Sequence, residues 1–409
     1  MKHQTINSKR TLLKKAILTI GLLLIFQMLT YIPAPFVDPE LIKTISTNNM
    51  FDAISLFAGH SFSNMTFMAM GISSYITASI VMQLLQYVFK HLHDLSKAPG
   101  GVKIIKRLTI LIGIGFSLIS SFTLTLTLNN SYQILTNTSF WALTLIAIVH
   151  AIGTGIAIWI GETITEKGFG NGVSLLIALN ILSGFTGMIA GIQANKHGWV
   201  PITVFVVSAI VVIFVETSYK NVKLIYLKAH ARGTNSFSEI TEKSIMPLKI
   251  NMGGVMPLIL STSLIQFCIM GLKLLKLSDF LGDIANWMAT PLGNGILTAI
   301  LIVLFSFIYS SISFEPEEIS KNIQKSQAVI ENVQPGVPTV RYLTKTSKQL
   351  TIISSIYMII LVLAPSIISY FSGIEIGVIG ATSIMIVLSV AIEIIMKVRN
   401  DINLMKLRF

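Results

Sequence analysis

The chain has 409 residues and a formal net charge of +12; 53% of its residues are hydrophobic and 12% are charged. Soluble domains carry about 25% charged residues, so this composition excludes an ordinary soluble protein. The apolar runs are continuous and close to the ~20 residues of a bilayer-crossing helix, whereas strands of a membrane barrel alternate apolar and polar residues over about 10 positions. The sequence therefore predicts an all-α polytopic membrane protein.

Ten apolar runs, each bounded by charges or by Pro, Gly or Asn turns, are predicted to be transmembrane helices. In chain order they cover residues 16–33, 71–89, 108–128, 140–161, 173–192, 200–216, 253–272, 295–313, 350–370 and 375–396. Ten spans divide into five plus five, and an odd number of spans per half inverts the second half. We expect an N-terminal half at 1–192, an external hinge loop at 193–199 and a C-terminal half at 200–409.

Between the first two spans, the external stretch 54–70 reads ISLFAGHSFSNMTFMAM. It is too apolar for a solvated loop and too short and interrupted to cross the membrane. An amphipathic helix at the interface is one interpretation. The other is a re-entrant segment packed inside the protein, where irregular backbone is tolerated at membrane depth.

The stretch 165–176, TEKGFGNGVSLL, has three glycines in five positions between the fourth and fifth spans. Such glycines can cradle a phosphate or turn the chain between two helices. A dinucleotide loop needs a strand before it and an acidic residue about 20 positions later. The flanks are instead long charge-free runs, which argues against a nucleotide site.

The distribution of basic residues predicts the orientation of the chain. An even number of spans puts both termini on one side, and that side holds 26 of the 30 lysine and arginine residues. The positive-inside rule makes this the cytoplasmic side, so the net charge requires no nucleic-acid partner. The longest cytoplasmic segments, 217–252 and 314–349, could still bind an acidic partner.

Residues that carry chemistry are scarce in the spans. The sequence has no HExxH, no GxSxG and no paired aspartates, so we expect no catalytic site, metal or cofactor. His150 in the fourth span is read as a hydrogen-bonded packing residue rather than a proton relay, and Glu393 as a partner of Lys397 one turn later. The single cysteine, Cys268, excludes an intramolecular disulfide.

Several segments in order resemble the SecY family, the channel subunit of the protein translocase, over nearly the whole length. They are MGISSYITASIVMQLL (70–85), IGETITEKGFGNGVSLLIALNI (160–181), PLKINMGGVMPLILSTSLIQF (247–267), FEPEEISKNIQKS (314–326), VQPGVPTVRYL (333–343) and IGATSIMIV (379–387). In this family the glycine-rich stretch is the tight cytoplasmic turn between the fourth and fifth helices. The resemblance implies two inverted five-helix halves and a re-entrant plug at about 54–70.

The resemblance also implies site residues, which we carry over by motif. An apolar pore ring that gates by excluding water would consist of Ile76, Ile80, Ile177, Ile181, Ile259 and Ile386. The plug would include Leu56, Phe57, Gly59, Ser61 and Ser63. Gln83 and Gln266 would face the lateral gate, although a packing role for these glutamines is equally open. A docking surface for the motor would include Lys220, Lys223, Lys228, Arg232, Gln334 and Arg341.

Two departures from the family pattern point to a subfamily. Ser74-Tyr75-Ile76 stands where the family usually has Pro-Tyr-Ile, and Val333-Gln334-Pro335-Gly336 stands where it usually has an arginine linked to the SecA motor. Together with the short chain, they indicate the accessory SecY of Gram-positive bacteria, which exports serine-rich glycosylated adhesins with an accessory SecA.

The expected function is a protein-conducting channel of the bacterial plasma membrane that hydrolyses nothing itself. A SecA-type ATPase motor would drive unfolded preproteins through it, with small SecE-like and SecG-like membrane subunits as further partners. The alternatives are a housekeeping SecY for general secretion and a ten-helix secondary transporter for a small solute. A substrate-binding charge at a broken helix in mid-membrane would favour the transporter, and the spans contain none.

Overall fold

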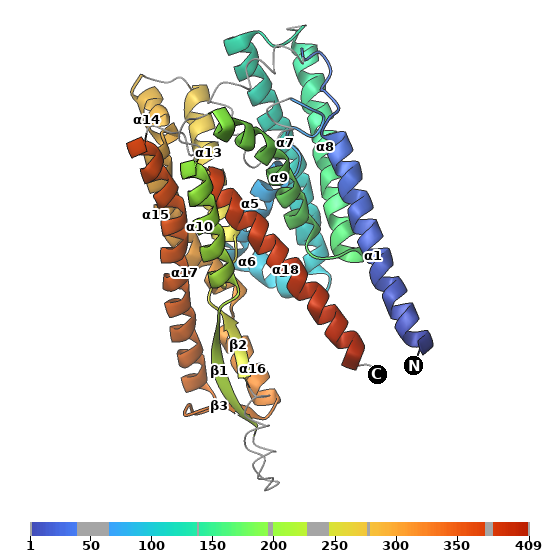
Figure 1. Ribbon diagram of the computed structural model, residues 1–409, viewed down its shortest axis with the longest axis vertical. Helices are drawn as coiled ribbons and strands as arrows, with labels where there is room; N and C mark the ends of the chain where they lie inside the picture. The colour runs from blue at the N-terminus through green and yellow to red at the C-terminus, as the bar shows by residue number, and fades with distance from the viewer. Residues whose placement is uncertain are drawn as a thin grey trace. The chain divides into compact units, whose positions relative to one another are not determined.

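The computed structural model spans residues 1–409 and describes residues 2–38, 65–136, 139–194, 199–226, 245–275, 279–372 and 379–407. These residues form helices and one small sheet (Figure 1). They divide into two compact units, which are described separately. Unit 1 comprises residues 1–203, 268–285 and 386–409, and unit 2 comprises residues 204–267 and 286–385.

Each of the ten predicted spans falls on a helix, which confirms the predicted fold class. The ten helices are α1 (Lys2–Leu29), α5 (Ser73–Val88), α7 (Gly101–Tyr132), α8 (Phe140–Lys167), α9 (Gly172–Ala194), α10 (Trp199–Glu216), α13 (Met256–Leu275), α15 (Pro291–Ser313), α17 (Val337–Ser372) and α18 (Ile379–Leu407). By length and composition alone, four described segments are long and apolar enough to cross a membrane: Gly101–Leu126, Phe140–Lys167, Leu292–Lys325 and Val337–Ile368. Among the described residues, three shorter helices lie outside the predicted spans: α6 (Lys90–Lys97), α14 (Asp279–Ala289) and α16 (Pro316–Lys325).

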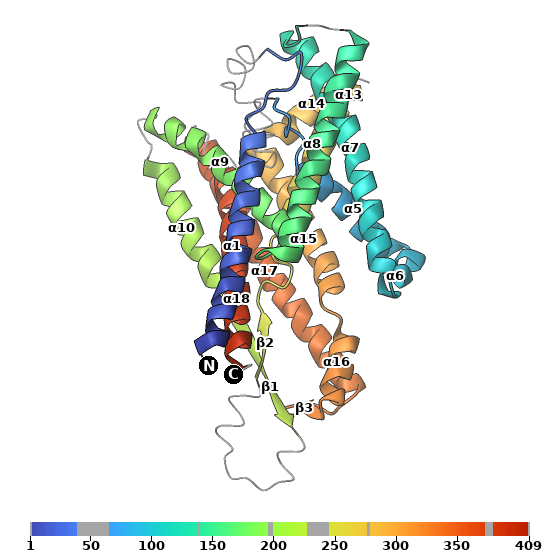
Figure 2. The same cartoon turned by 90° about the vertical axis from the view of Figure 1, so that its right-hand side faces the viewer.

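In unit 1, α7 and α8 pack side by side along much of their length (Figure 2). Hydroxyl groups and one imidazole are buried between them. Ser121 Oγ lies 2.6 Å from His150 Nδ1, and Ser117 Oγ lies 2.8 Å from Thr154 Oγ1. Because buried polar groups are costly unless they are hydrogen-bonded, these pairs hold the two apolar helices in register. His150 is thus a hydrogen-bonded packing residue, as the sequence predicts.

The glycine-rich stretch forms the turn between α8 and α9. Gly170 has a φ of 77°, which a residue with a side chain rarely adopts. A Cβ atom at Gly172 would lie 2.0 Å from the carbonyl oxygen of Gly161, so only glycine lets the two helices approach so closely here. The Gly172 amide donates to Thr165 Oγ1 at 2.9 Å. The glycines therefore turn the chain, and their contacts are with the protein itself.

The end of the stretch 54–70, which the sequence predicts to be external, is buried within unit 1. Met65, Met68, Ala69 and Met70 are buried, while residues 54–64 lie outside the described residues. The Ala34 amide donates to the Met65 carbonyl at 3.1 Å, so this segment is also fixed through its backbone. Burial of this kind favours the re-entrant interpretation over a helix lying on the membrane surface.

In unit 2, residues from both predicted cytoplasmic loops form a three-stranded antiparallel sheet in the order β2-β1-β3. β1 (Tyr219–Tyr226) follows α10, β2 (Ile245–Lys249) precedes α13, and β3 (Ala328–Ile330) follows α16. Tyr219 pairs with Lys249, and Leu224 pairs with Ile330. The all-helical prediction did not include this sheet, which joins the two loops into one body (Figure 1).

A small apolar core lies under this sheet. Its buried members are Val222, Leu248, Phe314, Ile323, Ala328, Ile330, Leu343 and Leu350. They come from the sheet, from the C-cap of α15 (Phe314), from α16 and from the N-terminal part of α17, so α17 belongs both to this body and to the helix bundle. Burial of these side chains makes the loops an ordered platform at the end of α17.

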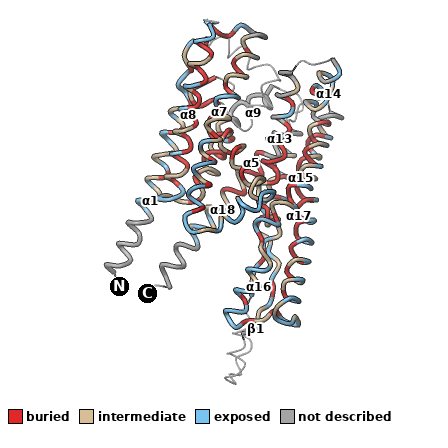
Figure 3. Tube along the Cα trace, turned by 180° about the vertical axis from the view of Figure 1, so that it is seen from behind, coloured by how far each residue is buried: buried red, intermediate tan, exposed pale blue. Residues whose placement is uncertain are grey.

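α15 and α17 pack through small hydroxyl side chains. Ser310 Oγ lies 3.1 Å from Ser347 Oγ, and Thr351 Oγ1 donates to Ser310 Oγ at 2.7 Å. Small polar residues let membrane helices approach closely and hydrogen-bond across the interface. Buried and exposed residues alternate along α17, which therefore has one packed face and one open face (Figure 3).

Candidate functional site

The predicted ring isoleucines lie on four helices and in both units. Ile76 and Ile80 are on α5, Ile177 and Ile181 on α9, and Ile386 on α18, all within unit 1. Ile259 is on α13 in unit 2. All are buried except Ile80, which is half-buried. Five of the six are thus shielded from solvent, as a closed constriction requires; a packing role would give the same burial, so the ring stays a prediction.

Of the two residues predicted to face the lateral gate, only Gln83 has a side chain that the structure describes. Gln83 Nε2 donates to Ser79 Oγ at 3.2 Å, one turn earlier on its own helix. Gln266 lies in α13, but its side chain is outside the described residues. The predicted plug residues Leu56, Phe57, Gly59, Ser61 and Ser63 also lie outside them. The gate and the plug therefore stay predictions.

Four of the six predicted docking residues lie on the platform of unit 2. Lys220 and Lys223 are on β1, and Lys223 Nζ lies 3.6 Å from the carboxylate of Glu331, just after β3. Arg341 lies in the first turns of α17. Lys228 and Arg232 fall between β1 and β2, outside the described residues. The sheet thus brings together residues from loops about a hundred positions apart, which the sequence did not reveal.

Gln334 is exposed in the turn between β3 and α17. The hydroxyl of Thr339 donates to the Gln334 carbonyl at 2.8 Å and fixes this turn against the start of the helix. Gly336, two residues later, has a φ of 95°, so the turn depends on a glycine there. A residue presented in this way is available to a partner protein.

A buried carboxylate at the junction of α10 and α13 was missed by the sequence analysis. Glu216, the last residue of α10, accepts a hydrogen bond of 2.6 Å from Asn251 Nδ2, which also lies 3.0 Å from the Gly254 carbonyl. The pair ties the end of α10 to the turn that starts α13. The only signal in the sequence was an acidic residue at the end of an otherwise uncharged helix. That pattern is equally typical of a helix end exposed to solvent.

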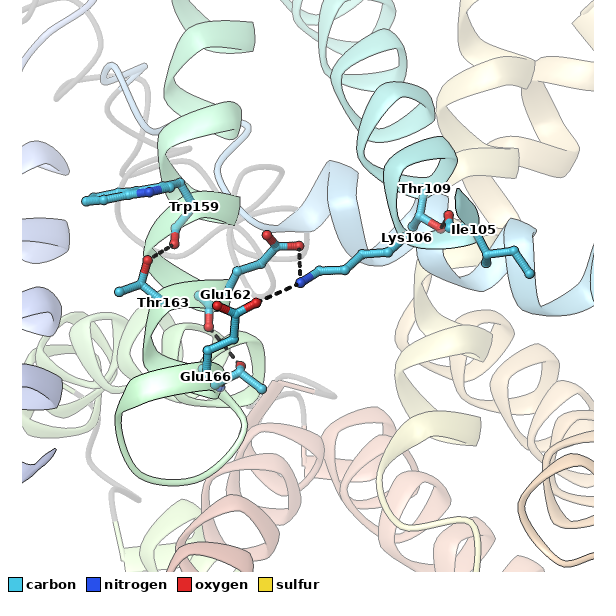
Figure 4. A network of polar contacts seen from close by, with 10 residues as sticks. Ile105, Lys106, Thr109, Trp159, Glu162, Thr163 and Glu166 are labelled. Carbon is cyan, nitrogen blue, oxygen red and sulfur yellow. Dashed lines mark hydrogen bonds and ion pairs between the residues drawn. The ribbon is translucent and has the colours of Figure 1, made fainter. Parts of the chain in front are cut away.

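A second charged cluster joins α7 to α8 in unit 1. Lys106 Nζ lies 3.1 Å from the carboxylate of Glu162 and 3.5 Å from that of Glu166, two acids one turn apart on α8 (Figure 4). All three side chains are partly exposed, so the pairs contribute on the order of 1 kcal/mol or less. The cluster orients the two helix ends and holds no group poised for catalysis.

The described residues contain no group of three or more His, Cys, Asp or Glu side chains that could hold a metal ion. What this molecule offers instead is a bundle of apolar helices, candidate ring positions that are uncharged, and an ordered basic platform. These features are typical of a multi-pass membrane transport protein, in which the predicted ring would act by shape and exclusion of water.

Comparisons with known proteins identify the family. The SecY family profile matches residues 66–395. The chain is 29% identical to the protein translocase subunit SecY of Staphylococcus carnosus, covering 95% of this chain and 94% of that protein. It is 32% identical to the SecY of Porphyra purpurea, over 92% of both chains. The SecY of Helicobacter pylori is 30% identical over 97% of both.

Solved structures show the same fold. A structure described as a protein conducting channel superposes with a TM-score of 0.68 at 18% identity, covering 95% of this chain and 92% of that one. Sec61 from the canine ribosome-channel complex gives a TM-score of 0.61, also at 18% identity and with the same coverage. The chain belongs to the SecY family: it is a multi-pass protein-conducting channel of the plasma membrane and not an enzyme.

Proposed function

We propose that this channel serves the accessory Sec route of a Gram-positive bacterium. In this role an accessory SecA-type ATPase drives unfolded preproteins, large serine-rich glycosylated adhesins, through the channel. Gln334 carries the proposal, because it stands exposed where the family usually has an arginine linked to the standard motor. Ser74, in the first turn of α5 where the family usually has proline, is a second departure.

The sequence identities do not separate the two candidate routes. The SecY proteins of Staphylococcus carnosus, Porphyra purpurea and Helicobacter pylori are 29%, 32% and 30% identical to this chain. Full-length coverage of those same relatives favours the other candidate, a housekeeping SecY for general secretion, and the choice of motor separates the two.

The proposed cycle uses the residues carried over from the family. At rest, the six isoleucines close an hourglass between an N-terminal half (1–192) and a C-terminal half (200–409) joined by the hinge 193–199. The plug, about 54–70, covers the external funnel. Gln83 and Gln266 hold the lateral gate with contacts worth ~0.6–2 kcal/mol. A motor on the cytoplasmic platform then pushes the unfolded chain through the ring, which opens around it.

The partner subunits are taken from the family resemblance, and the orientation of the chain from the positive-inside rule. SecE-like and SecG-like small subunits, or their accessory counterparts, complete the complex, with both termini in the cytoplasm.

The plug is tested with Ser61→Cys and an impermeant external thiol reagent. We expect labelling only when a jammed substrate holds the channel open, and equally fast labelling without substrate would exclude a plug.

The motor is identified by co-purification. The tagged channel is mixed with equal amounts of accessory and standard SecA, and the bound motors are quantified. We expect the accessory motor in excess, and we expect Gln334→Arg to raise the bound fraction of the standard motor. Gln324→Arg, the same change at an exposed glutamine on α16, controls for charge alone. Preferential binding of the standard motor by the unmodified channel would overturn the accessory proposal and favour general secretion.

A further inference from the structure

The open face of α17 carries a stripe that changes from apolar to basic at the edge of the predicted membrane span. Ile352, Ile356 and Ile360 are 48%, 53% and 58% exposed. One to three turns earlier on the same face lie the exposed basic side chains of Lys348, Lys345 and Arg341. The spacing of three, four and seven residues keeps these positions on one side of the helix.

The dimensions of this stripe match a lipid molecule at the membrane surface. At 1.5 Å per residue, Lys348 stands about 6 Å and Lys345 about 10 Å from Ile352 along the helix axis. The isoleucines continue for two further turns into the predicted span 350–370. An acyl chain can lie along them, while the two ammonium groups reach the depth of the phosphate.

The basic end of the stripe lines a shallow, open groove of about 600 Å³. Its walls come from a single helix and combine apolar side chains, Val337, Val340 and Ile352, with basic ones. Within the described part of the chain, none of Arg341, Lys345 and Lys348 forms an ion pair with a carboxylate. The groove therefore presents three basic side chains that an anionic ligand could neutralise.

We propose that this face of α17 is a binding site for an anionic phospholipid, with the headgroup phosphate between Lys345 and Lys348. Charge complementarity selects the headgroup, and the exposed isoleucines directly beneath it select an occupant with acyl chains. A soluble acidic protein would satisfy only the basic half of the stripe. Arg341 also belongs to the proposed motor-docking surface, so a lipid seated here lies next to the motor.

The test uses the full chain in detergent, titrated with phosphatidylglycerol or phosphatidylcholine and followed by native mass spectrometry. The variant is Lys345→Gln with Lys348→Gln, and the matched control is Lys321→Gln with Lys325→Gln, two exposed lysines four residues apart on α16. Lys345→Arg with Lys348→Arg keeps the charge. We expect the first variant to lose about fivefold in phosphatidylglycerol affinity per lysine, and the other two to keep it.

The remaining outcomes are equally decisive. Unchanged phosphatidylglycerol affinity in the Lys345→Gln, Lys348→Gln variant would overturn the proposal. An equal loss for phosphatidylcholine would do the same, because the lysines would then not distinguish the headgroups. If that variant loses motor binding in lipid-free detergent but keeps its phosphatidylglycerol affinity, the face is a protein-docking surface instead. Failure of the accessory assignment would leave this result untouched.

Discussion

Glu216 and Asn251 meet in the interior of unit 2, where the carboxylate of one accepts a 2.6 Å hydrogen bond from the amide of the other. The two residues are only 6% and 2% exposed. They join the last residue of α10 to the turn that begins α13, the helix that carries the predicted ring residue Ile259. The position of this ring residue therefore depends on a polar contact outside the ring.

Replacing Glu216 by alanine should destabilise the protein, because the Asn251 amide would lose its charged partner in the interior. Hydrogen bonds to charged groups contribute about 1.5–3 kcal/mol. Glu216→Gln should cost less, since an amide oxygen can still accept the bond. Thermal unfolding in detergent measures the difference. Glu317→Ala, at an exposed acid on α16, is the control, and an equal Tm for the two alanine variants would contradict the assigned role.

The turn between α8 and α9 offers a matched pair of glycines. In Gly172→Ala the new Cβ would lie 2.0 Å from the Gly161 carbonyl oxygen, so the helices must separate. Gly155 on α8 has no atom within 4 Å of such a Cβ. There the same substitution should stabilise the helix by about 0.5–1 kcal/mol. Opposite changes in Tm are expected, and a stabilising Gly172→Ala would show that the close approach is wrong.

The proposed docking surface is tested through its charges. Reversing Lys220, Lys223, Lys228 and Arg232 to glutamate should weaken motor binding. It should also make the remaining motor binding less sensitive to salt, because salt screens the long-range attraction that these four charges provide in the unmodified channel. Binding is measured at low and high ionic strength. The matched control for net charge reverses four exposed basic residues on α6 and α7 in unit 1: Lys90, Lys97, Lys103 and Arg107. Affinity and salt response that match the unmodified channel would place docking elsewhere.

The seal at the ring is tested by conductance. Ile177→Gly with Ile181→Gly should make the idle channel leak small ions in a planar bilayer, because the apolar constriction loses two branched side chains. The control is Ile148→Gly with Ile152→Gly, two exposed isoleucines with the same spacing on α8. It carries the same helix-propensity penalty and should not leak. If the Ile177→Gly, Ile181→Gly variant inserts normally and conducts no more ions than the unmodified channel, that result counts against the ring.

The helices could be predicted from the sequence because each span is a long apolar run with at most two charged residues, and this character does not depend on distant residues. The sheet could not. β1 does alternate polar and apolar residues from Asn221 to Leu224, but its partner strand β3 lies about a hundred residues away, in the other loop. No local pattern indicates which distant segment will pair with a strand.

The same limit applies to individual polar residues. Glu216 at the end of α10 looks like a solvated helix end, and only the fold of the turn at Asn251 shows that it is buried. His150 is the opposite case. An isolated histidine in an apolar run has few possible partners, so a hydrogen bond to a polar side chain could be expected from the sequence. That the partner is Ser121 could not. The ring isoleucines came from family resemblance, since branched apolar residues fill every span.

The most direct test is to ask which side chains a translocating polypeptide touches. A photo-cross-linking amino acid is placed at Ile181 or Ile259, or at the exposed positions Ile210 and Ile300 on α10 and α15, and a preprotein is stalled in the channel. We expect adducts with the preprotein from Ile181 and Ile259, and none from the two exposed positions. Adducts from Ile210 or Ile300 at equal yield, or none from the ring, would contradict a pathway through the six isoleucines.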